Sequence, residues 1–160
     1  MNTAPLKAGP RMGTKPAEVT TSLAYLVGAG LIIWSAYIHF HLWDSVGYRH
    51  IPTIGPLFLL QSIGGLIVGL LVLAFRQVWI AVAGIGFAAS TMVGFLLTVG
   101  LKGGLFGFKE SWSASFAHEA FAIEIATMVV LLIAGALSLT GSASSTRAGS
   151  TPSVAPMTGA

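Results

Sequence analysis

The chain contains no cysteine and few charged residues, and each shortage restricts what the protein can do. Without cysteine it forms no disulfide bonds, and thiolate metal sites, iron–sulfur ligation and thiol catalysis are excluded. Only 8% of the residues are charged and 54% are apolar, whereas a soluble domain carries about 25% charged residues. The eight Lys and Arg residues are too scattered to form the basic patch that nucleic acid requires. The composition therefore indicates an integral membrane protein.

Motifs of catalysis are also missing from the chain. There is no nucleophile elbow, no phosphate-binding glycine loop and no pair of catalytic carboxylates. The segment Gly84-Ile85-Gly86 has glycines at a suitable spacing, but it lies inside a long apolar run, where a phosphate loop is implausible. We therefore expect a non-enzymatic protein.

Four apolar stretches are long enough to cross a bilayer, which needs about 20 helical residues. They cover residues 23–43, 54–75, 78–101 and 116–139. The first stretch is too long for the apolar part of a signal peptide, so we interpret it as an uncleaved span. The sequence thus predicts an all-α, four-helix transmembrane bundle over residues 21–140. Residues 1–20 are expected to form a flexible basic tail, and residues 141–160 a disordered tail of low complexity.

The distribution of basic residues predicts the orientation, because four spans place both termini on one side. The basic residues on the side of the termini are Lys7, Arg11, Lys15, Arg76 and Arg147, and those on the opposite side are Arg49, Lys102 and Lys109. The positive-inside rule then places both termini in the cytoplasm.

Small residues recur at a spacing of four in two of the spans. Gly65 and Gly69 form a GxxxG pair, and Gly86, Ser90 and Gly94 repeat at the same interval. Such spacing lets helix backbones approach closely. We expect these residues to join the second and third spans into a tight hairpin, and dimerisation is the alternative.

Ionisable residues gather near the predicted outer face, where the first span ends and the fourth begins. They are His39, His41, Asp44, His50, His118, Glu119 and Glu124. Because the two spans are antiparallel, their histidine-bearing segments are expected at similar depth. His39 and His41 are two residues apart, about 200° around a helix, so they face different partners.

These residues permit two interpretations. In the first, His41 and His118 bind a divalent metal together with Asp44 or Glu119, or a haem lies between His118 and either His39 or His41. In the second, the histidines and neighbouring aromatic residues only anchor the helices at the membrane boundary. The ligands would come from separate helices, and no HxxxH or HExxH pair is present.

Glu124 lies about 9 Å deeper than His118 along its span, at 1.5 Å per residue. A charged carboxylate at a helix centre costs about 2.5–3.5 kcal/mol, so we expect Glu124 to point into the bundle and to have a partner. His39 is the predicted partner, and Tyr37 and Gln61 are the alternatives. Such a pair also permits proton handling.

Two segments carry a resemblance to known proteins: Tyr37 to Trp43 (YIHFHLW) and Gly47 to Gln61 (GYRHIPTIGPLFLLQ). They resemble small four-span integral membrane proteins of high-GC bacteria, a group without an assigned activity. The resemblance implies the architecture and nothing catalytic.

Three functions stay open at this point. The first is an accessory or structural subunit of a membrane complex, with lipid, other membrane proteins or a second copy as partners. The second is a haem- or metal-binding protein of electron transfer, and the third is a proton-coupled transporter.

Overall fold

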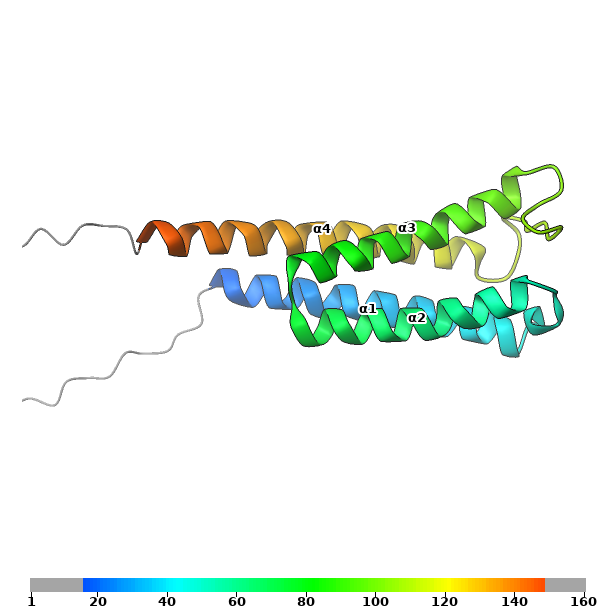
Figure 1. The fold of residues 1–160 in the computed structure, drawn as a ribbon, viewed down its shortest axis with the longest axis horizontal. Coiled ribbons are helices and arrows are strands. Elements are labelled where there is room, and N and C mark those ends of the chain that lie inside the picture. The colour runs from blue at the N-terminus through cyan, green and yellow to red at the C-terminus, as the bar shows by residue number, and fades with distance from the viewer. Residues whose placement is uncertain (1–15, 149–160) are drawn as a thin grey trace, which may run out of the picture.

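The computed structural model describes residues 16–148, and this part of the chain is helical (Figure 1). The elements in order are α1 (Pro16–Asp44), the short 3-10 helix η1 (Tyr48–His50), α2 (Ile54–Phe75), α3 (Val78–Gly100) and α4 (Ala117–Ala148). Each of the four α-helices is long and apolar enough to cross a membrane. The predicted all-α, four-helix membrane architecture is therefore confirmed.

The helices run lengthwise beside one another, so the molecule has two ends (Figure 1). The loop end carries residues 45–53 and 101–116, which connect α1 to α2 and α3 to α4. The termini end carries the turn at Arg76 and Gln77, the start of α1 and the end of α4. Arg76 makes that turn with a left-handed backbone, at a φ of 48°, and its N–H bonds Val72 O.

Two of the helices extend beyond the predicted spans. The second span has the predicted limits and the third ends one residue early, but α1 already begins at Pro16 and α4 continues to Ala148. Residues 16–20 and 141–148, which we expected in the tails, are thus helical. Pro16 suits the first helical position and Glu18 offsets the helix dipole in the first turn. At the other end, each added residue extends a helix that has already nucleated. Residues 1–15 and 149–160 of the predicted tails lie outside the described part.

The helices differ in length, and the two longer ones, α1 and α4, project beyond the turn between α2 and α3. With 29 and 32 residues, α1 and α4 are about 44 and 48 Å long, against about 30 Å of bilayer hydrocarbon. Figure 1 shows the start of α1 and the end of α4 extending past the α2–α3 turn. Both helices are thus longer than the hydrocarbon layer is thick.

Helix α1 lies against both α2 and α4, whereas α3 packs mainly on α4 and less on α2. The buried core is in the half of the bundle toward the termini. Its larger members are Tyr25, Ile32, Val72, Ile80 and Leu131. Tyr25 also shares a hydrogen bond of 3.2 Å with Ser138 across the α1–α4 contact. In lipid these contacts stabilise the bundle by dispersion and close packing, because lipid tails are as apolar as the side chains.

The glycines of α2 make a close contact, but with α1. A Cβ atom at Gly69 would lie 2.6 Å from Ile33 Cγ1, and one at Gly65 would lie 3.0 Å from Ala36 Cβ. The expectation that α2 and α3 form the tightest pair is wrong. The ring of Phe87 on α3 lies against Gly65, where a Cβ atom would be 3.2 Å from it, and so holds the α3 backbone away.

The second small-residue stripe has no such contact. A Cβ atom at Gly86 or Gly94 would meet nothing within 4 Å, and Ser90 is exposed. The predicted packing role of Gly86, Ser90 and Gly94 therefore has no counterpart within residues 16–148.

Candidate functional site

Two of the four predicted metal ligands, His41 and Asp44, contact neighbours that are not metal ligands. The ring of His41 stacks on Tyr37, with centroids 6.2 Å apart, and meets the edge of Phe116 at 5.4 Å. Asp44 forms an exposed ion pair of 3.0 Å with Arg49. Exposed pairs of this kind contribute about 0–1 kcal/mol to stability.

The other two predicted metal ligands, His118 and Glu119, contact tryptophan side chains. The His118 ring packs on Trp112 at 5.7 Å, and Glu119 accepts a hydrogen bond of 3.1 Å from Trp34 Nε1. Within residues 16–148 no three histidine or acidic side chains lie close enough to hold a metal ion together. The structure thus does not assemble the predicted metal site from His41, Asp44, His118 and Glu119, because each of these side chains is engaged by a separate neighbour.

The deeper polar residues meet through a serine that the sequence analysis did not single out. Ser35 Oγ donates a hydrogen bond to Glu124 Oε1, and His39 Nδ1 lies 2.9 Å from the Ser35 carbonyl oxygen. All three residues are buried. The described part of the chain shows no hydrogen bond or ion pair between His39 and Glu124 themselves, so the predicted pair is joined through Ser35. The spacing of four places Ser35 and His39 on one face of α1, a signal that points to Ser35 but not to its bond with Glu124.

The two alternative partners of Glu124 are also engaged elsewhere. Tyr37 is 54% exposed on the outside of α1. Gln61 donates its amide N–H to Thr91 Oγ1 across the α2–α3 contact.

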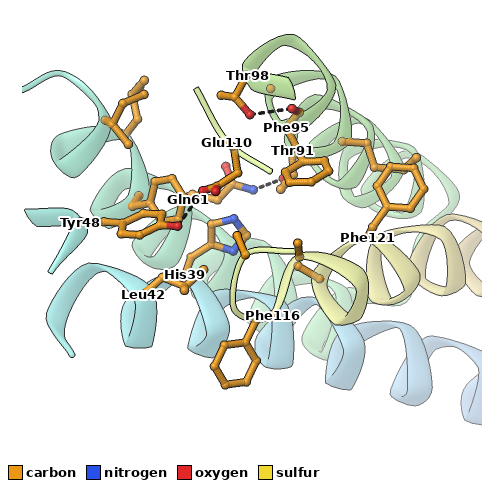
Figure 2. A pocket seen from close by; sticks show the side chains of 18 of the residues that line it. His39, Leu42, Tyr48, Gln61, Thr91, Phe95, Thr98, Glu110, Phe116 and Phe121 are labelled. Carbon is orange, nitrogen blue, oxygen red and sulfur yellow. Dashed lines mark hydrogen bonds between the residues drawn. The ribbon is translucent and has the colours of Figure 1, made fainter. Parts of the chain in front are cut away.

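A cavity of about 180 Å³ adjoins these polar groups in the loop half of the bundle. It receives residues from all four helices, η1 and the α3–α4 connection. The aromatic part of its lining comprises Tyr48, Phe58, Phe95, Phe108 and Phe121. Figure 2 shows the imidazole of His39 directed into this space, whereas the Phe116 ring points away from it. The cavity lies where α2 and α3 diverge toward the loop end (Figure 1).

A hydrogen bond between η1 and the α3–α4 connection lies over the cavity at the loop end. Tyr48 Oη donates to Glu110 Oε2 at 2.6 Å, and Glu110 N donates to Thr98 O at 3.3 Å. Burial raises the pKa of Tyr48, and the hydrogen bond to Glu110 and its negative charge raise it further. The phenol therefore stays neutral and remains a donor at physiological pH.

Besides the exposed Ser115 hydroxyl, three polar side-chain atoms of the cavity lining have no hydrogen-bond partner within residues 16–148. In Glu124 only Oε1 is bonded, in His39 only Nδ1, and in Gln61 only Nε2. Among the described residues, no fully buried side-chain nitrogen or oxygen lacks a hydrogen bond. Glu124 Oε2, His39 Nε2 and Gln61 Oε1 must therefore be open to the cavity that these side chains line.

The chemistry of their partners makes all three atoms acceptors. A carbonyl oxygen only accepts, so His39 Nδ1 carries the proton and the neutral ring presents Nε2 as an acceptor. Thr91 Oγ1 donates to Phe87 O at 3.1 Å and so receives the Gln61 N–H, which leaves Gln61 Oε1 free. Glu124 Oε2 is an acceptor in the carboxylate form.

The hydroxyl groups of α3 that line the cavity are already engaged as donors. Ser90, Thr91 and Thr98 donate to carbonyls of their own helix at 2.7, 3.1 and 2.6 Å. The described part of the chain contributes Glu110 and Glu124 to the lining but no Lys or Arg. Acceptor atoms and carboxyl groups thus dominate the polar part of the cavity.

Comparisons with known proteins identify no relative. No protein-family model, curated protein or solved structure matches the chain.

Proposed function

We propose that this chain is a non-enzymatic membrane protein that binds a small, mostly apolar molecule in the loop-half cavity and exchanges it with the surrounding lipid. The observation that carries the proposal is the cavity itself, which combines an aromatic lining with a few convergent polar atoms. This combination is typical of small-molecule sites in proteins.

The size of the cavity limits the molecule to about one ring. Cavities of about 150 Å³ in other proteins hold a benzene molecule, so a space of about 180 Å³ suits a ring with a short substituent. Its lining includes Leu57 of α2 and Ser90 of α3, which are both exposed on the sides of the bundle. These two residues support entry between α2 and α3 from the lipid, because the Tyr48–Glu110 bond covers the loop end.

Fluorescence of Trp112 tests the proposal, because its ring packs on two residues of the lining. Trp112 lies 4.8 Å from the Phe95 ring and 5.1 Å from the Phe121 ring. A variant with phenylalanine at the other three tryptophans, in lipid nanodiscs, reports quenching by 4-bromotoluene at this position alone. We expect a saturable component of the quenching.

A matched pair of variants separates cavity binding from quenching through the lipid. Gly94 lines the cavity and Gly86 does not, and a Cβ at either meets nothing within 4 Å. Gly94→Phe should abolish the saturable component, whereas Gly86→Phe on the same helix should leave it. Saturable quenching that survives in Gly94→Phe, or none in the parent, would overturn the proposal.

We further propose that the protein resides in the bacterial cell membrane with both termini in the cytoplasm. The basic residues of the sequence support this, because with four spans five of them, including Arg76, fall on the side of the termini and three on the opposite side. The absence of cysteine makes single-cysteine labelling free of background. In intact cells an impermeant maleimide should label Lys102→Cys and spare Gln77→Cys, and the reverse pattern would refute the orientation.

A second candidate function is an accessory subunit of a membrane complex, with a second copy of this chain as the partner in the simplest case. The open stripe of Gly86, Ser90 and Gly94 favours it, since small residues allow close approach of a partner helix. A Gly86→Cys variant should form a cross-linked dimer or adduct in native membranes. The control is Leu96→Cys, an exposed position on the same helix about 120° around from Ser90, the middle of the stripe. Equal cross-linking of both variants would count against a specific contact.

A further inference from the structure

The polar atoms that face the cavity restrict its ligand more narrowly than its size does. Three acceptors, Glu124 Oε2, His39 Nε2 and Gln61 Oε1, are open to one space and receive no hydrogen bond from the described residues. Figure 2 shows the side chains of His39 and Gln61 among those that line the cavity. A ligand that satisfies them must bring donors of its own.

The lining of the cavity contains acidic side chains without basic Lys or Arg side chains among the described residues. Glu110 and Glu124 contribute carboxyl groups, and no Lys or Arg of residues 16–148 lines the cavity. Glu124 is 2% exposed, and Ser35 is its only hydrogen-bond donor in this part of the chain. A buried carboxylate with a single neutral donor lacks a counter-charge, so a cationic ligand is favoured over a neutral or anionic one.

The aromatic residues around these acceptors fit the same class of ligand. The faces of Phe rings attract cations, and Phe58, Phe95, Phe108 and Phe121 line the cavity. An ammonium group carries three N–H donors and no acceptor, which matches the three open acceptors in number.

We propose that the ligand of this cavity is a primary ammonium compound with one ring-sized apolar group. The inference rests on the proposed function, because it requires that the cavity binds a small molecule. The ammonium lies toward Glu124, His39 and Gln61, and the apolar group lies among the phenylalanine rings.

Four brominated probes of similar size test the proposal in the single-Trp112 variant. They are 4-bromobenzylammonium, its N,N,N-trimethyl derivative, 4-bromobenzyl alcohol and 4-bromobenzoate. Binding is the saturable part of the quenching that Gly94→Phe removes, so partition into the lipid is subtracted for each probe. We expect the primary ammonium to bind roughly 10- to 100-fold more tightly than the alcohol, because hydrogen bonds to charged groups are stronger than neutral ones.

The other probes separate charge from hydrogen bonding. The trimethyl derivative keeps the charge but has no N–H donor, so it should bind more weakly than the primary ammonium. The benzoate should not bind. Equal affinity of ammonium and alcohol, or tighter binding of the benzoate, would overturn the proposal.

Substitution of the carboxyl group gives an independent test. In Glu124→Gln the affinity for the ammonium should fall to that for the alcohol, while the affinity for the alcohol stays within about threefold. An unchanged preference for the ammonium would refute the assigned role of Glu124. If Glu124→Gln does not fold, as judged by its helical circular dichroism, the order of the four probes in the parent protein decides the question.

The outcomes also distinguish this inference from the proposed function. Suppose that Gly94→Phe removes the saturable quenching by 4-bromotoluene, but the ammonium binds no more tightly than the alcohol. The cavity is then a ligand site, and only the proposed ligand class is wrong. If no probe shows removable binding, both proposals fail.

Discussion

Substitution of Gly69 by alanine should weaken the contact between α1 and α2. The new Cβ would lie 2.6 Å from Ile33 Cγ1 and 3.3 Å from the backbone oxygen of Ala29. Ile33 cannot move aside cheaply, because a β-branched side chain in a helix has one strongly preferred χ1 angle. The helices must instead separate by roughly 1 Å, which forfeits about a quarter to a half of the dispersion energy at the contact.

The size of the effect follows from two opposing terms. Overpacking of a close contact costs about 1–3 kcal/mol, and replacing Gly by Ala in a helix returns up to about 1 kcal/mol. In Gly86→Ala only the gain in helix propensity applies, because a Cβ there meets nothing within 4 Å. We therefore expect Gly69→Ala to be less stable than Gly86→Ala by about 1–3 kcal/mol.

Unfolding in mixed micelles with increasing SDS, followed by circular dichroism, measures this difference. The two variants carry the same chemical change on neighbouring helices, so their comparison removes effects of the residue type. A difference below about 0.5 kcal/mol, smaller than typical overpacking costs, would show that the glycine face of α2 does not set the α1–α2 distance.

Three further results are expected. Ser35→Ala removes the donor to the buried Glu124 carboxyl and should lower the free energy of unfolding by about 1 kcal/mol, measured in the same assay; no loss would contradict the Ser35 bridge. The raised pKa of Tyr48 means that the neutral phenol stabilises the fold fully below about pH 10, and that this contribution is lost as the pH rises further. The absorbance at 295 nm between about pH 9 and 11 should thus be the same in the parent and Tyr48→Phe, and a missing component in the variant would refute the shift. Gly104→Ala should displace the α3–α4 connection, because Gly104 has a φ of 70° and a Cβ would overlap Phe108 O, while Gly103→Ala should not; Trp112 emission reports the difference.

Hydropathy and length were sufficient to predict the four helices. They gave the limits of α2 and nearly those of α3, because apolar composition alone decides which segments enter lipid. They missed the extensions of α1 to Pro16 and of α4 beyond Leu139, because hydropathy marks the apolar part of a helix and not its continuation into polar sequence. Local signals such as Pro16 and Glu18 were present in the sequence but were assigned to the tail.

The site was predicted only in outline. Antiparallel topology brought His39 and Glu124 to similar depth, and both do line the cavity. The bond from Ser35 to Glu124 could not be predicted, since one serine in an apolar helix carries no signal of its partner on another helix. The cavity itself arises from the divergence of α2 and α3 beyond the Phe87 contact, and such divergence depends on side-chain packing in three dimensions. For the same reason the sequence did not show that Gly69 faces α1, where it meets Ile33 and Ala29, and does not face α3.

The unequal packing of α3 has a consequence for how the chain is made. As synthesis proceeds, α1 and α2 can dock as soon as both have left the ribosome, because their mutual contact is extensive. Helix α3 follows but has its main contacts with α4, which is the last to emerge. We therefore expect the half-made protein to be a docked helix pair with a loosely held third helix. The final segment completes the bundle and locks α3 in place.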